Sequence, residues 1–243
     1  MLISLKNVSF AYQKKIVLND ISFDIDQSMS VLGANGSGKS TLLKIMLGFL
    51  PYRGRVEILG KDVKEYSKNA LSKLIAYIPQ SHTLAYEYSV YDLVLMGAIS
   101  RTPLLSSYTK QDRQKALFYI EKMGISELKN ESYTKISGGQ RQLAYIARAL
   151  MQEARIIFMD EPTNGLDFGN QIKLLNILKS LISDGYHIVQ TTHHPRHALY
   201  VTKSSLLLRG GKILEFGESK SIITTQNINR LYDIKYENFK EVL

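Results

Sequence analysis

The order of apolar and polar residues predicts that the chain begins in β-strands. Residues 2–12 and 16–25 are rich in β-branched and aromatic residues with partial alternation, and a polar turn at 13–15 separates them. Such alternation is typical of strands that bury one face. We therefore expect an antiparallel β layer at the N-terminus.

After residue 28 the chain alternates between short apolar runs and longer helical patterns. The run ARIIFMDEP is apolar up to its two acids, as is typical of a strand buried in a parallel sheet. The segment SSLLLRGGKILEFG predicts a hairpin that turns at Gly210-Gly211. Further strands are expected at MSVLG, RVEILG, IAYIPQ and HIVQTTHH. The alternation predicts a parallel α/β core.

Residues 81–135 differ from this core because their patterns are helical. Within them the apolar positions fit a period of 3.6 residues, which predicts one buried helix face. The positions are Ala116, Leu117, Ile120 and Met123. We expect residues 81–135 to form a helical lobe inserted into a single domain that spans residues 1–243.

Composition narrows the class of protein. The 243 residues contain 44% hydrophobic and 22% charged residues, as in a soluble globular protein, and the absence of cysteine excludes disulfides and thiolate metal sites. The N-terminus lacks the pattern of a signal peptide, and no apolar run approaches the roughly 18 residues of a membrane span. We expect a soluble intracellular chain. The net charge of +9 is compatible with several anionic partners, and the scattered lysines select none of them.

A glycine-rich segment, GANGSGKST, lies between an expected strand and an expected helix. It fits the phosphate-binding pattern in which backbone N–H groups and a helix N-terminus surround phosphate oxygens. Lys39 can reach the β- and γ-phosphates, and the hydroxyl of Ser40 can ligate magnesium. The candidate nucleotide-binding residues are Gly33, Asn35, Gly36, Ser37, Gly38, Lys39, Ser40 and Thr41.

Two adjacent acids end the apolar strand IIFMDE. Asp160 is the candidate magnesium ligand that accompanies the phosphate loop. Glu161 can polarise an attacking water. Because a magnesium site alone would need only the aspartate, the second acid predicts hydrolysis.

A second pair of glycines opens the helical pattern of residues 135–150, where each glycine costs about 1 kcal/mol relative to alanine. The phosphate loop, the segment SGGQ and the acids DE follow one another in an order that resembles the ATP-binding subunit of an ABC transporter, over essentially the whole chain. The resemblance implies ATP and Mg²⁺ as cofactors. It also implies the ABC ATPase fold, an α/β P-loop NTPase core with a parallel sheet, an N-terminal antiparallel β layer and an inserted α-helical lobe.

The same resemblance implies a head-to-tail homodimer. In such a dimer the signature residues of one subunit cap the ATP that the phosphate loop of the other subunit holds, and bare glycine backbone lets the γ-phosphate approach. The signature residues are Ser137, Gly138, Gly139 and Gln140.

Four further positions take roles from this resemblance. Tyr12 lies where an aromatic ring stacks on adenine. Gln80 matches the glutamine that contacts magnesium and the attacking water, and that joins the lobe to the core. Asp167 matches an aspartate that crosses the dimer interface, and His193 matches a histidine that contacts the γ-phosphate and orients the water.

The sequence also departs from the family pattern. Ile136 replaces the usual leucine, and the segment between Phe23 and Gly33 is about two residues short, which predicts a tight turn. His194 stands where an aspartate is common, so we assign it to solvent or structure. The remaining histidines show no metal-ligand arrangement; they are His82, His187 and His197.

The segment 88–112 resembles the lobes of importers of iron chelates, cobalamin and haem, although GAIS replaces a common Gly-Arg. KISGGQRQL, LDFGNQ and TTHHP resemble the molybdate/tungstate branch more closely, and residues 221–234 resemble the group's final helix with its Leu-Tyr pair. The resemblance implies a membrane permease contacted near Tyr91 to Tyr108, an extracytoplasmic substrate-binding protein and a place at the cytoplasmic face of the membrane. We expect an iron chelate as cargo first, and an oxyanion next.

Two alternatives stay open. One is the ATPase subunit of an ABC exporter. The other is a soluble ABC-type ATPase that acts on nucleic acid, although the chain lacks a long coiled-coil insertion and a second cassette. No nucleic-acid partner is expected.

Overall fold

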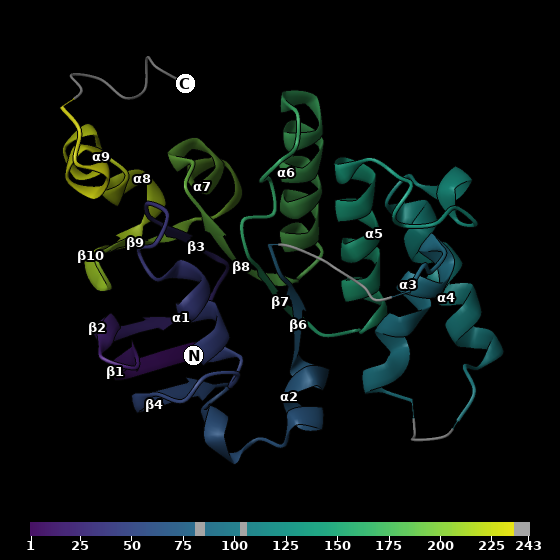
Figure 1. The fold of residues 1–243 in the computed structure, drawn as a ribbon, viewed down its shortest axis with the longest axis horizontal. Helices are drawn as coiled ribbons and strands as arrows, with labels where there is room; N and C mark the ends of the chain where they lie inside the picture. Colours follow the sequence, from purple (N-terminus) through teal and green to yellow (C-terminus); the bar gives the residue numbers. More distant parts are fainter. Residues whose placement is uncertain (81–85, 103–105, 236–243) are drawn as a thin grey trace.

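The computed structural model describes residues 1–80, 86–102 and 106–235 (Figure 1). A four-stranded sheet in the order β2-β1-β4-β5 forms the N-terminal layer, and all its neighbouring strands are antiparallel. Its strands are β1 (Ile3–Tyr12), β2 (Lys15–Ile25), β4 (Arg53–Ile58) and β5 (Lys61–Asp62). The expected antiparallel layer is confirmed.

The second sheet has six strands in the order β10-β9-β3-β8-β7-β6. Its strands are β3 (Met29–Leu32), β6 (Ile75–Ile78), β7 (Ile156–Met159), β8 (His187–Thr192), β9 (Ser204–Arg209) and β10 (Lys212–Glu218). The pairs from β9 to β6 are parallel, whereas β10 pairs antiparallel with β9 through the hairpin at Gly210-Gly211. The α/β core is therefore as predicted. Only residues 26–28 separate β2 from β3, in agreement with the predicted tight turn.

Helices flank the central sheet, and α5 lies between α6 and the pair α3 and α4 (Figure 1). The helices are α1 (Lys39–Met46), α2 (Lys68–Leu74), α3 (Val90–Leu95), α4 (Lys110–Lys122), α5 (Gly138–Met151), α6 (Phe168–Ser183), α7 (Pro195–Val201), α8 (Ser219–Ile222) and α9 (Thr225–Tyr232). Short 3₁₀ helices span Val63–Glu65, Met96–Ser100 and Ser126–Leu128. Within the described residues, no helix has the length and apolarity to cross a bilayer.

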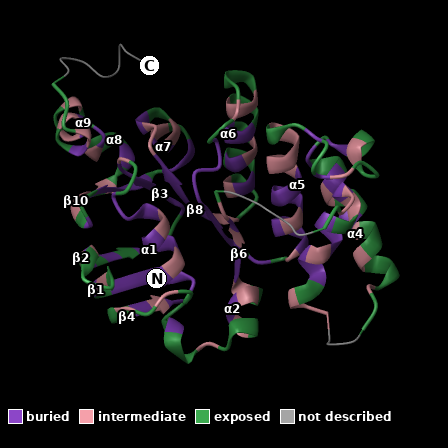
Figure 2. Cartoon of the chain, viewed as in Figure 1, coloured by how far each residue is buried: buried purple, intermediate pink, exposed green. Residues whose placement is uncertain are grey.

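Three apolar clusters fill the molecule. One joins α3 and α4 to α5, α6 and β7; a second joins the antiparallel sheet to α1 and β3; a third lies beneath α7, α8 and α9. Figure 2 shows the central strands as buried and much of α4 as exposed.

One residue of the expected buried face of α4 is on the outside. Ala116, Ile120 and Met123 are buried, but Leu117 is 45% exposed. The buried stripe follows the spacing i, i+4, i+7, and a residue at i+1 is turned about 100° away from it. The placement of α3 and α4 agrees with the expected lobe, whose bounds at 81 and 135 stay a prediction; residues 81–85 lie outside the described part of the chain.

Candidate active site

The phosphate loop connects the carboxyl end of β3 to the first residue of α1, so it lies at the mouth of the parallel sheet. Gly36 and Gly38 have φ angles of 78° and 106°, which side-chain-bearing residues rarely adopt. A Cβ on Gly33 would lie 2.4 Å from the carbonyl oxygen of Leu208, and one on Gly38 would lie 2.8 Å from Leu18 Cδ2. The chain's own packing therefore requires glycine at 33 and 38.

Gly36 is different because no atom lies within 4 Å of the position of its Cβ. The loop borders an open cleft of about 620 Å³. Within the part of the chain that the structure describes, the buried hydroxyl of Ser37 has no hydrogen-bond partner. The cleft is lined by Val17, Asn35, Gly36, Gly38, Lys39, Ser40, Thr41, Gln80, Glu161, Asn164 and His193. A backbone cradle with a lysine and hydroxyls at a helix N-terminus fits the phosphates of a nucleotide.

Lys39 lies at the centre of the cleft although its side chain is only 4% exposed. Its ammonium group donates to the carbonyl oxygens of Gly33, at 2.9 Å, and Ala34, at 3.1 Å. The same nitrogen lies 3.1 Å from Glu161 Oε1. The cation is therefore held by the loop and by the acid together.

Polar side chains that follow the two strands on either side of β7 meet at Glu161. Because β6, β7 and β8 are adjacent and parallel, Gln80, Glu161 and His193 meet at the same edge of the sheet. Glu161 Oε2 accepts a hydrogen bond from Gln80 Nε2 at 3.3 Å and lies 3.2 Å from His193 Nδ1. Its other oxygen faces Lys39. The structure thus brings Glu161, Gln80 and His193 together, and the roles expected of them stay predictions.

Thr191 fixes both acids, and the sequence analysis missed it. Its hydroxyl donates to Asp160 Oδ1 at 2.6 Å and accepts from the backbone N–H of Glu161 at 2.8 Å. Glu161 itself has a positive φ of 47°, which turns its side chain off the strand direction. The only signal in the sequence was the pair of threonines before His193.

Asp160 is buried; burial of Tyr77 first, and the negative charge of Asp160 second, raise the pKa of Tyr77 to about 12. Within the described residues, no group of three or more histidine, cysteine, aspartate or glutamate side chains could hold a metal without a nucleotide. Nucleotide-bound Mg²⁺ usually takes one or two protein oxygens besides phosphates and water. Asp160 and the hydroxyl of Ser40 have the chemistry for that requirement, and Gln80, which lines the cleft together with Ser40, offers an amide oxygen.

The signature segment begins α5 with a reciprocal cap. The hydroxyl of Ser137 accepts from the backbone N–H of Gln140, and the amide oxygen of Gln140 accepts from the backbone N–H of Ser137. A Cβ on Gly139 would lie 3.0 Å from Asn170 Cγ, so the packing of α6 accounts for this glycine. Apart from its chain neighbours and its own helix backbone, the described atom nearest to a Cβ on Gly138 would be Leu166 Cδ2, at 3.9 Å. The chain's own contacts do not require glycine at 138.

The signature borders a cleft of its own, of about 580 Å³, which Ser137, Gln140, Asn170 and Lys173 help to line. Within the described residues, no signature residue lines the phosphate-loop cleft. The chain thus carries two separate hollows, each with half of the expected nucleotide site.

Asp167 caps the N-terminus of α6. Its carboxylate accepts from the backbone N–H of Asn170 at 2.9 Å and from the Asn170 side chain, and these hydrogen bonds lower the pKa of Asp167. The carboxylate is solvent-exposed, as is the neighbouring Phe168, which is 78% exposed.

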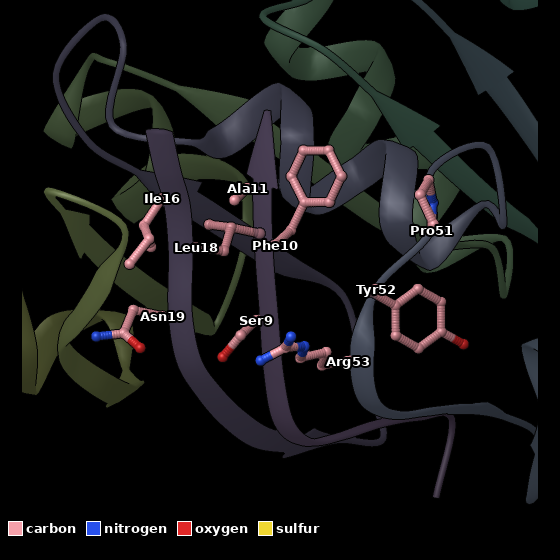
Figure 3. A pocket seen from close by; sticks show the side chains of 9 residues that line it. All are labelled: Ser9, Phe10, Ala11, Ile16, Leu18, Asn19, Pro51, Tyr52 and Arg53. Carbon is pink, nitrogen blue, oxygen red and sulfur yellow. The ribbon is translucent and has the colours of Figure 1, made fainter. Parts of the chain in front are cut away.

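Tyr12 ends β1, is 48% exposed and meets Phe10 edge-on at 4.6 Å between ring centroids. It does not line the phosphate-loop cleft, whereas Val17 of the neighbouring strand does. A third hollow, of about 560 Å³, lies beside Phe10, Leu18 and Tyr52 (Figure 3). Adenine stacking on Tyr12 stays a prediction, and Val17 is a lining residue that the sequence analysis did not single out.

Two further histidines follow His193 with their rings in tilted contact, away from the lining of the cleft. The ring of His194 lies 4.1 Å from that of His193 and 4.5 Å from that of His197. Burial and the neighbouring histidines lower the pKa of His197 to about 4, and burial followed by His193 lowers the pKa of His194. Both shifts favour the uncharged imidazole, so His193 contacts the ring of His194, and His194 contacts that of His197, without added positive charge. His187 begins β8, and His82 lies outside the described residues.

The chain has extensive similarity to known proteins. The ABC transporter family model matches residues 18–164. The molybdate import ATP-binding protein MolC of Haemophilus influenzae is 33% identical, over 96% of this chain and 88% of the relative. A probable iron chelatin transport ATP-binding protein of Helicobacter pylori is 33% identical, over 98% of this chain and 95% of the relative.

A solved structure described as an inward-facing metal-chelate type ABC transporter gives a TM-score of 0.83 at 33% identity. The match covers 95% of this chain and 88% of that one. The matched segment contains the phosphate loop, the signature and both acids of the site. The chain belongs to the ABC transporter family, as one of its ATP-hydrolysing, ATP-binding subunits.

Proposed function

We propose that this chain binds ATP at the phosphate loop and hydrolyses it with Glu161 as general base. The observation that carries the proposal is the Glu161 carboxylate, placed beside the loop with Lys39, Gln80 and His193 on its two oxygens. Glu161 takes a proton from the water that attacks the γ-phosphorus, and the bond to the β-phosphate oxygen breaks to leave ADP and phosphate. Gln80 and His193 hold that water in line.

Lys39 has to leave Glu161 before the reaction. Its ammonium group is the cation nearest the loop, and a γ-phosphate carries more negative charge than one carboxylate. ATP therefore draws Lys39 from Glu161 and frees the base. Mg²⁺, held by Ser40 and Asp160 with Gln80 nearby, would neutralise phosphate charge that develops during transfer.

We further propose that the chain works as a head-to-tail homodimer. Three observations support it: the two half-sites border separate clefts, the chain's own contacts do not require glycine at 138, and the exposed Phe168 follows Asp167. In the dimer Ser137, Gly138 and Gly139 approach the γ-phosphate that the partner subunit holds.

Mixing two inactive variants tests this arrangement. Lys39→Ala damages the phosphate loop and Ser137→Arg fills the space at the signature, so each homodimer should be nearly inactive. A mixed dimer has one complete site, and ATP-dependent closure or slow hydrolysis should return. Otherwise wild-type chains with one cysteine introduced at each of the two motifs should also form an ATP-dependent crosslink between differently tagged subunits. Absence of that crosslink would overturn the head-to-tail arrangement.

We infer that the dimer powers import of a metal-containing solute through a separate membrane permease. The named relatives serve molybdate and iron chelates, and the related structure is of the metal-chelate type. An iron chelate is the first candidate cargo and an oxyanion the second. The subunit would sit at the cytoplasmic face of the membrane, with an extracytoplasmic binding protein as an indirect partner. The exporter and nucleic-acid alternatives have no comparable support. Reconstitution with permease and binding protein tests this, because only the true cargo should stimulate ATP hydrolysis.

The lobe is the proposed contact with the permease. Ile99 is 59% exposed and lies within the Tyr91 to Tyr108 segment, whereas Phe118 is 57% exposed on α4 outside that segment. Ile99→Asp should abolish copurification with the permease and leave ATP binding intact, while the matched Phe118→Asp should preserve both. Loss of nucleotide affinity in Ile99→Asp with intact permease binding would contradict the assignment.

A further inference from the structure

Helix α9 packs directly behind the phosphate loop and His193. Its Ile228 and Leu231 share an apolar cluster with Leu32, Ala198 and Leu207. Leu32 immediately precedes the phosphate loop, and Ala198 lies in α7, which begins two residues after His193. A helix outside the segment matched by the family model, residues 18–164, is thus built into the back of the site.

Tyr232, the last residue of α9, makes the polar contact between this helix and the site. Its hydroxyl donates a hydrogen bond of 2.7 Å to the backbone carbonyl of His193. The ring is half-buried and packs against the same apolar cluster. Burial first, and the negative charge of Glu161 second, raise the pKa of Tyr232, so the hydroxyl stays protonated and remains a donor.

The carbonyl of His193 needs such a donor. Ala198 N–H bonds to the carbonyl of His194, so the helical hydrogen bonds of α7 begin one residue after His193. On the other side, β8 ends at Thr192. His193 therefore lies between two regular elements, and the Tyr232 hydroxyl fixes its peptide group where neither ladder does.

Surface charges add little to this attachment. Arg209 pairs with Asp233 at 3.3 Å and Arg230 pairs with Glu215 at 3.4 Å, but all four side chains are more than a third exposed. The apolar cluster and the Tyr232 hydrogen bond join α9 to the segment around His193.

We propose that Tyr232 is a positioning residue for ATP hydrolysis, which holds the backbone of His193 so that its imidazole stays in reach of Glu161. The proposal rests on the role of His193 given above. The Leu-Tyr pair at the end of α9 would then contribute to the reaction as well as to packing.

Removal of a single hydroxyl tests the proposal. Tyr232→Phe keeps the ring and its packing, and should lower kcat about tenfold, since small misplacements of a reacting group have large kinetic effects. KM for ATP should change by less than about twofold, because the phosphate loop is intact. The matched control is Tyr200→Phe, which removes the hydroxyl of a tyrosine on α7 that donates to Asn176 instead. It should behave as the wild type.

A double-mutant cycle asks whether Tyr232 acts through His193. In a His193→Ala background, Tyr232→Phe should have no further effect on kcat. An equal effect in both backgrounds, or wild-type kcat in Tyr232→Phe, would overturn the inference alone. Wild-type kcat in His193→Ala would overturn the proposed role of His193 and the inference with it.

A measurement without turnover separates positioning from general stability. In nucleotide-free protein labelled with ¹⁵N-histidine, the resonances of His193, assigned by their loss in His193→Ala, should shift in Tyr232→Phe and not in Tyr200→Phe. Unchanged His193 resonances together with a lowered melting temperature in Tyr232→Phe would show a packing role and contradict positioning.

Discussion

The phosphate loop and the signature segment both place glycines beside a helix N-terminus, yet the chain uses them differently. At Gly33 a Cβ would collide with the carbonyl oxygen of Leu208, so the fold itself requires glycine. At Gly138 a Cβ would make only an ordinary contact, 3.9 Å from Leu166 Cδ2, and Ser137 and Gln140 already cap the helix without help from glycine. A glycine that the folded chain does not need is what the proposed approach of a nucleotide from another subunit would require. Packing inside the chain therefore explains Gly33, whereas Gly138 is explained by the proposed contact with a second subunit.

The largest expected effect comes from breaking the phosphate-loop half alone. Glu161→Gln removes the base and the charge that holds Lys39, so ATP binding should persist while hydrolysis falls by roughly 10²–10⁴-fold. The variant should accumulate as an ATP-bound dimer in size-exclusion chromatography. Glu121→Gln, at an exposed position on α4, is the matched control. Near-normal turnover in Glu161→Gln would remove it from the mechanism.

Alanine at the two glycines tests the contrast itself. Gly138→Ala should leave the melting temperature unchanged or slightly higher, because alanine favours a helix by up to about 1 kcal/mol. It should weaken ATP-driven dimerisation about tenfold if a phosphate approaches that backbone. Gly33→Ala should instead lower the free energy of unfolding by about 1–3 kcal/mol, since the added Cβ overpacks a filled site. Urea denaturation and analytical ultracentrifugation measure the two effects. Equal loss of stability in both variants would erase the distinction.

The smallest effect concerns the histidines that support the phosphate-loop half. The unfolded chain protonates His197 near pH 6.5, whereas the folded chain does so only near the lowered pKa of about 4. The contribution of the uncharged His197 to the free energy of unfolding is therefore complete above pH 6.5, and it declines as the pH falls toward 4. His197→Gln should show a smaller loss of stability across this window than the wild type, by thermal melting at several pH values. Identical pH dependence in both proteins would place His197 in solvent.

Patterns among neighbouring residues were enough to predict most helices and strands. They also identified the glycines and the charged residues that belong to the sequence motifs. The strand before Asp160, the phosphate loop and the hairpin at Gly210-Gly211 each follow from residues that are neighbours in sequence. Thr191 and Tyr232 were missed because their roles arise from contacts between distant segments. Strand order brings Thr191 beside Asp160, and no periodicity in the sequence encodes that adjacency.

The exposure of Leu117 has a similar physical cause. Its apolar character fits a buried helix face, but the face of α4 that contacts α3 and α5 is only wide enough for Ala116, Ile120 and Met123. Amphipathic spacing predicts that a face exists, and the neighbouring helices decide how wide it is. The sequence alone could not supply that width.

The reciprocal cap of Ser137 and Gln140 also bears on the speed of assembly. Because the two residues satisfy each other's backbone groups within one chain, the start of α5 is already ordered before another subunit arrives. Association then loses little conformational entropy at this surface, and less of the interaction free energy is consumed in folding it. In the proposed dimer, two subunits would therefore meet through a signature surface that is already formed, and ordering of the start of α5 would not slow their association.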